Sequence, residues 1–345
     1  MEAREILRKL TEGISLTEEE SRGLADMIME GSIQESLVAA ILVALKMKGE
    51  TAEEIKGFVK SMREHAIKLD LKDTLDTAGT GGDGFGTINV STAAALAISN
   101  VFPVAKHGNR AASSKSGSAD FLETLGYNIT VPPERATQLI KRDNFVFLFA
   151  QLYHPSMKNV APVRKLLGIR TIFNLLGPLA NPAGSKRQVM GVYSLSIMRK
   201  IAQTSAGLGY SKLLILHGEP GLDEVSPQGK TYITEVKGDK MEEMDVDFRD
   251  ISKKEVPPSR LLVSDSTESA VRVLRACRGK DPDVNHFIRI NVAVALYAAD
   301  VVTDFKEGYE FSEELILKLP EKIESIVKNN GDLSKFMKIK EISYG

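Results

Sequence analysis

The chain has 345 residues, of which 43% are hydrophobic and 26% charged, and its formal net charge is -1. This length predicts about two domains or one large α/β domain, and the composition excludes disorder as the main state. The charge balance excludes a protein that binds nucleic acid through one broad basic surface. The single cysteine, Cys277, rules out an internal disulfide and predicts a cytoplasmic protein, and no apolar run is long enough for a membrane span.

The first 70 residues have the pattern of consecutive amphipathic helices. Three capping boxes are predicted, because Thr17, Ser32 and Thr51 are each followed by a glutamate three positions later. The helix predicted over 33–48 is apolar around most of its circumference. We therefore expect it to be buried on more than one side, against the rest of the chain or against a second subunit.

After residue 71 the pattern changes to alternating strands and helices. Strands are predicted over 74–78, 102–106, 127–131, 145–150, 188–193 and 212–217, with helices over 91–98, 118–125, 133–141 and 195–208. An antiparallel hairpin is predicted over 231–246, and helices again over 268–328. This order predicts an α/β protein with a small all-helical domain and a larger α/β domain whose central sheet is mostly parallel.

The loop over 79–87 holds five glycines within eight positions. Such a loop lets backbone N–H groups converge on an anion, and the helix predicted to follow adds its N-terminus. A Walker A loop is excluded because no Gly-Lys-Ser/Thr follows. A phosphate loop of another kind is favoured over a dinucleotide site, which lacks its acidic residue, and over a purely structural turn.

A basic and hydroxyl-rich segment over 106–118 follows the next predicted strand. Its cations Lys106 and Arg110, with small residues and hydroxyls, suit a phosphorylated ligand at the end of a parallel strand. A solvated polar loop is the alternative. Beyond this segment, Arg164 could bind a carboxylate through two nitrogens of its guanidinium or be a surface cation. His154 could belong to the site or be a buried histidine with a purely structural role.

Two adjacent acids, Asp223 and Glu224, follow the strand predicted over 212–217. Carboxylates combined with phosphate oxygens are the ligands that Mg²⁺ prefers, so a magnesium site is one hypothesis. A general acid and base, or an acid pair on the surface, are the alternatives. Zinc is disfavoured, because the histidines and Cys277 lack its ligand spacing.

Together these motifs closely resemble the family of anthranilate phosphoribosyltransferases, over nearly the whole chain. The matching strings are 76–83, 89–92, 106–110, 116–120, 154–155, 164–171, 174–179, 181–182 and 221–224. The resemblance implies transfer of the phosphoribosyl group of 5-phosphoribosyl 1-pyrophosphate (PRPP) to the amino group of anthranilate, with release of pyrophosphate, in tryptophan biosynthesis. It implies catalysis by orientation and electrostatics, with no certain catalytic residue.

The resemblance also implies three sets of site residues. PRPP would be held by Gly79, Gly82, Asp83, Thr87, Asn89, Val90, Ser91, Thr92, Lys106, His107, Gly108, Asn109, Arg110, Ala111, Ala112, Ser113, Ser114 and Ser118. Anthranilate would be held by Gly79, Asn109, Arg164, His107, Tyr153, His154 and Pro178. Mg²⁺ would be bound by Ser91, Asp223 and Glu224.

The domain plan that the resemblance implies has two parts and a hinge. Residues 1–70, with a segment near 160–180, would form a helical domain and the interface of a homodimer. Residues 71–160 and 181–345 would form the α/β domain that binds PRPP, with the hinge near 70–75 and 160–180. No nucleic-acid or membrane partner is expected. The alternative functions are a pyrimidine nucleoside phosphorylase and a non-catalytic nucleic-acid-binding member of the same fold.

Overall fold

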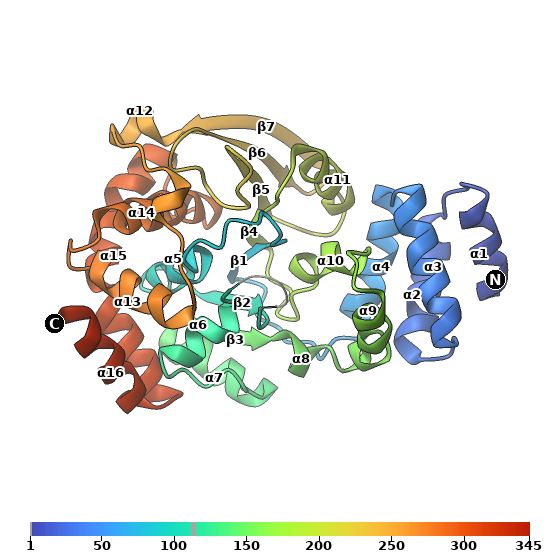
Figure 1. The fold of residues 1–345 in the computed structure, drawn as a ribbon, viewed down its shortest axis with the longest axis horizontal. Helices are drawn as coiled ribbons and strands as arrows, with labels where there is room; N and C mark the ends of the chain where they lie inside the picture. Colours follow the sequence, from blue (N-terminus) through green and yellow to red (C-terminus); the bar gives the residue numbers. More distant parts are fainter. Residues whose placement is uncertain (1, 112–114) are drawn as a thin grey trace.

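The computed structural model describes residues 2–111 and 115–345. Four helices at one end of the molecule form a bundle, and a seven-stranded sheet with flanking helices forms the rest (Figure 1). The bundle helices are α1 (Ala3–Thr11), α2 (Glu18–Glu30), α3 (Glu35–Lys48) and α4 (Ala52–Glu64). The two chain ends lie at opposite ends of the molecule (Figure 1).

The bundle confirms two of the three predicted capping boxes. Thr17 and Thr51 each accept a hydrogen bond from the backbone N–H of the glutamate three positions later, and that glutamate bonds back to the cap. The third prediction, at Ser32, is wrong. The helix begins at Glu35 instead, and the Ser32 hydroxyl donates to the carbonyl of Met27 within the preceding turn. Ser32 closes the end of one helix rather than opening the next.

The sheet has the order β3-β2-β1-β4-β5-β6-β7. Its first five strands in this order run parallel and the last two form the antiparallel hairpin that the sequence predicts. The strands are β1 (Leu75–Gly79), β2 (Val104–Gly108), β3 (Phe145–Phe149), β4 (Arg187–Gly191), β5 (Lys212–Gly218), β6 (Lys230–Lys237) and β7 (Lys240–Asp247). The predicted mostly parallel sheet is therefore confirmed.

The chain reverses its direction of winding between β1 and β4. It passes from β1 outward to β2 and β3, then returns to place β4 and β5 on the other side of β1. Both β1 and β4 end at a glycine, Gly79 and Gly191, which are paired in register. In open α/β sheets, ligands bind outside the carboxyl ends of the strands at such a switch point.

Two hydrophobic cores cover the two faces of the sheet. Alternate residues of β5 divide between them, with Leu214 and Leu216 in one core and Leu213 and Ile215 in the other. The first core is formed with helices that lie mostly in the C-terminal half. They are α5 (Val90–Ile98), α6 (Ser118–Thr124), α7 (Pro133–Asp143), α12 (Phe248–Ser252), α13 (Ser266–Ala276), α14 (Pro282–Ala298), α15 (Phe305–Asn329) and α16 (Leu333–Tyr344).

The second core joins the helical bundle to the other face of the sheet. It contains apolar side chains of the bundle, of α11 (Leu195–Ser205) and of the segment over 160–180. That segment includes α9 (Ala161–Leu167), α10 (Phe173–Leu176) and η2 (Gly177–Leu179), and α8 (Ala150–Tyr153) and η1 (Pro155–Asn159) precede it. A further short 3-10 helix, η3 (Pro258–Arg260), lies before α13. Figure 1 shows α9 and α10 between the bundle and the sheet.

One sequence prediction about an apolar segment is wrong, and a second, burial of the helix over 33–48 on more than one side, is not tested by a single chain. The segment over 127–131 is no strand and makes only an isolated bridge from Tyr127 to Gly331, with the side chains of Tyr127, Ile129 and Val131 buried in the first core. The helix α3 is buried on one side only, through Val38, Ile41, Leu42 and Leu45, whereas Ala40 is exposed and Met47 is 84% exposed. Its apolar circumference leaves an uncovered face in this single chain.

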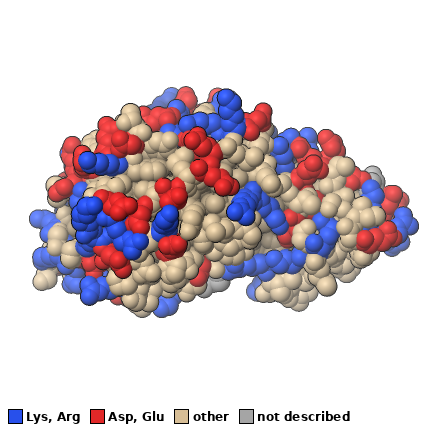
Figure 2. Space-filling view, turned by 90° about the horizontal axis from the view of Figure 1, so that it is seen from above, with Lys and Arg blue, Asp and Glu red and all other residues tan. Residues whose placement is uncertain are grey.

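The lone cysteine and the absence of a long apolar helix both agree with the sequence. Cys277 is buried, and burial raises the pKa of its thiol to about 12. Within the described residues no helix is long and apolar enough to cross a bilayer. Figure 2 shows acidic and basic side chains intermixed over one face of the molecule, as the near-zero net charge implies.

Candidate active site

The glycine-rich loop lies between β1 and α5, at the switch point of the sheet. Gly81, Gly82, Gly84 and Gly86 all have positive φ, which explains why glycine occupies these positions. The first N–H of the loop, from Thr80, donates to the carbonyl of Gly191 at 2.9 Å, which ties the loop to β4. The N–H groups of Gly82, Asp83 and Gly84 make no hydrogen bond within the described part of the chain. They remain available to an anion.

The segment after β5 brings Asp223 directly beneath this loop. Its Oδ2 accepts the N–H of Gly81 at 2.7 Å. A Cβ atom on Gly79 would lie 2.7 Å from the same oxygen, and one on Gly191 would lie 1.6 Å from the Asp223 carbonyl oxygen. The glycines that end the two switch-point strands are therefore needed for the close approach of Asp223.

Asp223, Asp83 and Glu224 form a cluster of three carboxyl groups, which we call the acidic cluster. Burial, together with the charge of Asp83, raises the pKa of Asp223 to about 7. Burial and the charge of Asp223 likewise raise the pKa of Glu224 well above its usual range. The alternative of an acid pair on the open surface is wrong, because Asp223 is only 9% exposed.

The acidic cluster fits a hard divalent cation. A bound cation would relieve the mutual repulsion that raises these pKa values. Ser91, in the first turn of α5, is hydrogen-bonded to Glu224, so the three predicted metal ligands lie in one neighbourhood. No three Asp, Glu, His or Cys side chains among the described residues make a complete metal cage. Mg²⁺ typically uses one or two carboxylates together with waters and substrate phosphates.

The two cations that the sequence assigns to phosphate are engaged elsewhere. Lys106 is 2% exposed, and its Nζ donates to the carbonyl and, at 3.1 Å, to the hydroxyl of Thr77. Burial lowers the pKa of Lys106, against the opposing charges of Asp76 and Glu224. The Arg110 guanidinium donates to both carboxylate oxygens of Glu123, at 3.2 and 2.8 Å. Residue type alone does not show that a charge already has a partner.

The remaining residues predicted to hold PRPP lie around the ends of β1 and β2. Asn89 caps α5 and exchanges hydrogen bonds with Ser116, and Thr87 pairs with Leu262. Gly108 ends β2, Asn109 and Ala111 follow it, and Ser118 opens α6. The side chains of Val90 and Thr92 are buried, and the Thr92 hydroxyl has no hydrogen-bond partner among the described residues. Ala112, Ser113 and Ser114 lie outside the described residues.

Two buried histidines form the opposite side of the site, and we call them the imidazole pair. The ring centroids of His107, on β2, and His154 are 5.1 Å apart. His107 Nδ1 bonds the Gly177 carbonyl at 3.2 Å, and a hydrogen bond joins His154 to the backbone of Ala180. Burial lowers the pKa of His107 to about 3, helped by His154, and that of His154 to about 4.

Both imidazoles are therefore neutral, and each has an Nε2 without a partner among the described residues. Since Nδ1 of His107 faces a carbonyl, it must carry the hydrogen, which leaves Nε2 as a hydrogen-bond acceptor. A buried polar atom without a partner is rare in a folded protein and costly. A ligand that donates hydrogen bonds would satisfy these atoms.

Other predicted acceptor residues divide into two groups. Arg164 lies on α9 with its guanidinium 5.8 Å from the ring of Phe173, and burial lowers its pKa. It has no ion-pair partner among the described residues, so the interpretation as a carboxylate clamp stays open. Pro178 follows Gly177 beneath His107. The side chain of Tyr153 is fully buried and donates to the Val131 carbonyl at 2.8 Å, and its place around the acceptor stays a prediction.

Several polar residues that sequence reasoning missed support the site from below. Asp76 is fully buried, accepts the N–H of His107 at 3.1 Å and lies 3.4 Å from the amide of Gln188. That amide also donates to the Pro178 carbonyl at 2.6 Å. Burial raises the pKa of Asp76 to about 6. The missed signal was a polar residue inside each of two predicted buried strands.

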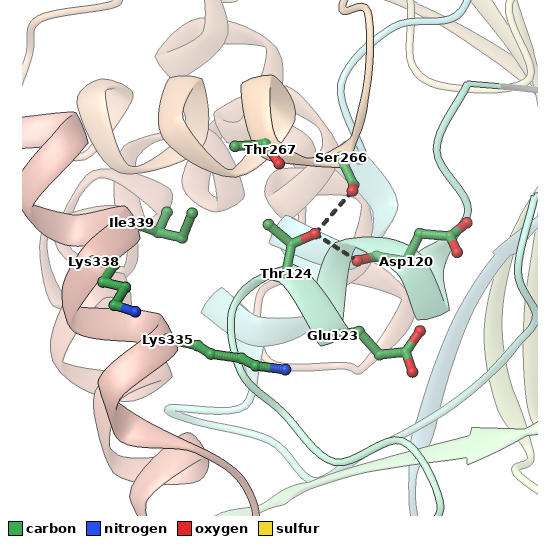
Figure 3. A pocket seen from close by; sticks show the side chains of 8 residues that line it. All are labelled: Asp120, Glu123, Thr124, Ser266, Thr267, Lys335, Lys338 and Ile339. Carbon is green, nitrogen blue, oxygen red and sulfur yellow. Dashed lines mark hydrogen bonds between the residues drawn. The ribbon is translucent and has the colours of Figure 1, made fainter.

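A surface cavity of about 500 Å³ lies on the far side of α6 and is distinct from this site (Figure 3). It is lined by Asp120, Glu123, Thr124, Ser266, Thr267, Lys335, Lys338 and Ile339. Asp120 accepts the N–H groups of Ala111 and Gly117, and Glu123 holds Arg110. The acids of this cavity therefore hold the ends of the segment after β2, and their charges are used within the protein.

A flanked α/β sheet with an anion-accepting loop and acids at its switch point is typical of enzymes that bind phosphorylated ligands. Comparison with known proteins agrees. A family model described as "Glycosyl transferase family, a/b domain" matches residues 71–318, and one described as "Glycosyl transferase family, helical bundle domain" matches residues 4–66. A relative from Metallosphaera sedula, named anthranilate phosphoribosyltransferase, is 70% identical over 99% of both chains.

Solved structures show the same similarity. The anthranilate phosphoribosyltransferase of Thermus thermophilus superposes with a TM-score of 0.85 at 36% identity, over 97% of this chain and 99% of that one. The enzyme from Saccharomyces cerevisiae, in complex with PRPP and Mg, has a TM-score of 0.84 at 28% identity over 98% of each chain. The chain belongs to the anthranilate phosphoribosyltransferase family, within the glycosyl transferase family whose two models it matches.

Proposed function

We propose that this protein transfers the phosphoribosyl group of PRPP to the amino group of anthranilate. The bond from ribose C1 to the pyrophosphate oxygen breaks, a bond from C1 to the amine nitrogen forms, and pyrophosphate and one proton are released. The observation that carries the proposal is the pairing of two unlike subsites at one sheet edge. The acidic cluster and open loop amides suit a metal-bound diphosphate, and the imidazole pair suits a neutral amine.

The loop and the acidic cluster would stabilise the leaving group. The free N–H groups of Gly82, Asp83 and Gly84 point to an anion there, and Asp223, Glu224 and Ser91 would hold Mg²⁺. When bound, that ion supplies positive charge to the departing pyrophosphate. The ribosyl carbon then becomes oxocarbenium-like, as in glycosyl transfer.

The imidazole pair and Arg164 would place the acceptor. The amine of anthranilate donates hydrogen bonds, and the Nε2 atoms of His107 and His154 accept them. An imidazole with a pKa near 3 or 4 is a weak base, so the pair orients the amine more than it removes its proton. Arg164 would bind the carboxylate with both nitrogens of its fork. Helix α10 lies between Arg164 and His107. Its first residue, Phe173, contacts the Arg164 guanidinium, and Gly177, directly after the helix, contacts His107 through its carbonyl.

The test is the decay of anthranilate fluorescence with the purified protein, PRPP and Mg²⁺, omitting each component in turn. The expected result is a decay that needs the protein, PRPP and Mg²⁺ together. Release of base from thymidine with free phosphate would favour the nucleoside phosphorylase instead. Tight, salt-sensitive DNA binding without transfer would favour the non-catalytic alternative.

We also propose a homodimer formed through the helical bundle. The uncovered face of α3, with Ala40 exposed and Met47 84% exposed, supports it, since a monomer rarely leaves an apolar helix face open. Sedimentation analysis should give twice the chain mass. Met47→Glu should shift it to the monomer, whereas Met241→Glu, at a 49% exposed methionine of β7, should not.

The hinge near 70–75 and 160–180 and the domain bounds 1–70, 71–160 and 181–345 stay predictions. The segment over 160–180 packs in the same hydrophobic core as the bundle, which supports grouping the two. The same core also includes residues of the sheet, so it does not separate the two domains. Small-angle scattering with and without PRPP and anthranilate would test closure. A cytoplasmic location likewise stays a prediction, made from the single cysteine.

A further inference from the structure

The positive charge at the diphosphate side of the site is smaller than the sequence predicts. The Nζ of Lys106 donates to Thr77, and the guanidinium of Arg110 donates to Glu123. A diphosphate is itself strongly anionic. Loop amides and one metal ion would have to balance all of it unless another cation reaches the loop.

Arg170 is a cation that does reach the loop. Its Nη2 donates to the carbonyl of Gly82 at 3.1 Å, across 88 positions of sequence. The contact is so close that a Cβ on Gly82 would lie 2.0 Å from the same nitrogen. The guanidinium is stacked on the ring of Tyr193, with its central carbon 4.7 Å from the ring centroid.

The guanidinium of Arg170 still has donors to offer. It carries five N–H groups, and in the described part of the chain only the one to Gly82 is used. No carboxylate of the described residues lies within ion-pair distance of it. Stacking on Tyr193 fixes the plane of the fork without neutralising its charge. An oriented and unpaired guanidinium next to free loop amides is suited to a phosphate.

The position of Arg170 in the chain connects the two subsites. Arg170 lies six residues after Arg164 in the sequence. Helix α9, which carries Arg164, is capped at its C-terminal end by Gly168 with positive φ, and Arg170 lies just beyond this end. Beyond it, Ile172 and Phe173 are buried in the core shared with the bundle, and the Thr171 N–H donates to Asn174 at 3.0 Å. The short segment is thus anchored at both ends, and it extends from the acceptor side to the loop.

We propose that Arg170 binds the diphosphate of PRPP at the glycine-rich loop and that Tyr193 orients it. This inference rests on the proposed function. One segment then carries a cation for each substrate, Arg164 for the anthranilate carboxylate and Arg170 for the diphosphate. In the absence of ligand the Gly82 carbonyl holds the guanidinium in place.

The test combines kinetics with direct binding of inorganic pyrophosphate. In Arg170→Gln, the KM for PRPP and the inhibition constant of pyrophosphate should rise about tenfold, the usual effect of losing a charged hydrogen bond. The KM for anthranilate should change less than about twofold, because that substrate makes no contact with Arg170. Arg170→Lys keeps the charge without the fork and should fall between wild type and Arg170→Gln. Titration calorimetry with pyrophosphate and Mg²⁺ should show the same order.

Two further variants keep the inference testable if Arg170→Gln is unstable. Tyr193→Leu leaves the guanidinium but removes its stacking surface, and should weaken pyrophosphate binding about threefold. Lys165→Gln removes an exposed charge from the same segment and should leave binding unchanged.

Three results are decisive. Wild-type pyrophosphate affinity in a folded Arg170→Gln protein overturns the inference, as does an equal rise in both KM values accompanied by a lower melting temperature. If wild-type protein binds pyrophosphate through Arg170 but consumes no anthranilate, the proposed function fails while the diphosphate contact stands.

Discussion

Burial raises the pKa values of the acidic cluster and lowers those of the imidazole pair, although both lie near the same edge of the sheet. In each region the fold forces like groups together and removes them from water. For Asp223 and Glu224 the result is a raised pKa and unrelieved repulsion, which a cation would remove. For His107 and His154 the result is a lowered pKa and two neutral rings with free acceptor atoms. The same physical cause prepares one subsite for charge and the other for a neutral donor.

The largest effect is expected from the acidic side. Asp223→Asn combined with Glu224→Gln removes the negative charge but keeps the shape, so transfer at limiting Mg²⁺ should fall about a hundredfold. The measurement is anthranilate fluorescence decay across a Mg²⁺ titration, with Glu255→Gln, a surface acid paired to Arg249, as the control. An unchanged titration would remove both acids from the metal site.

The acceptor side should respond through one substrate only. Arg164→Ala should raise the KM for anthranilate about tenfold to a hundredfold, since a hydrogen bond to a charged group contributes about 1.5–3 kcal/mol. The KM for PRPP should stay near its wild-type value, which steady-state kinetics with each substrate varied will show. Equal increases for both substrates would contradict the carboxylate assignment.

Geometry can be separated from charge on the acidic side. Gly191→Ala adds a methyl group 1.6 Å from the Asp223 carbonyl oxygen, so the segment must move. We expect a loss of about 1–3 kcal/mol in the free energy of unfolding, measured by denaturant titration, together with weaker Mg²⁺ dependence. Gly23→Ala, in helix α2 with nothing within 4 Å, is the matched control and should be neutral or stabilising. Equal stability of the two variants would show that Asp223 does not need its close approach.

The smallest effect concerns the pH dependence of stability. The folded pKa values of His107 and His154 lie below the ordinary 6.5, so the stability they contribute is complete above pH 6.5 and is lost as the pH falls toward 4 and then 3. His107→Asn can keep the donor to the Gly177 carbonyl without titrating. It should lessen the fall in unfolding free energy between pH 6.5 and 4 by about 1 kcal/mol for each pH unit, measured by denaturant titration at each pH.

His65→Asn, in the turn after α4, serves as the control for this titration. If the unfolding free energy falls as steeply below pH 6.5 in His107→Asn as in wild type, the imidazole pair is not held neutral by burial.

The sequence by itself determined the features that depend on neighbours along the chain. The capping boxes at Thr17 and Thr51 and the hairpin β6–β7 follow from local pattern, because their bonds join residues close together along the chain. The strand β3 follows from its continuous apolar run. The glycine-rich loop could also be predicted from the sequence, because positive φ at four of its positions favours glycine. The apolar pattern over 127–131 fits either a strand or an irregular segment buried in the core, and the prediction of a strand was wrong.

Only the tertiary structure decided which site residues are free to act. The Arg110 guanidinium donates to Glu123, the Lys106 ammonium to Thr77 and the Tyr153 hydroxyl to Val131, so each of these side chains already has a partner within the chain. The acidic cluster and the bond between Arg170 and Gly82 join segments 88 or more residues apart. Charge and type are properties of a residue, but availability depends on partners that the order of the sheet strands brings together from distant parts of the chain.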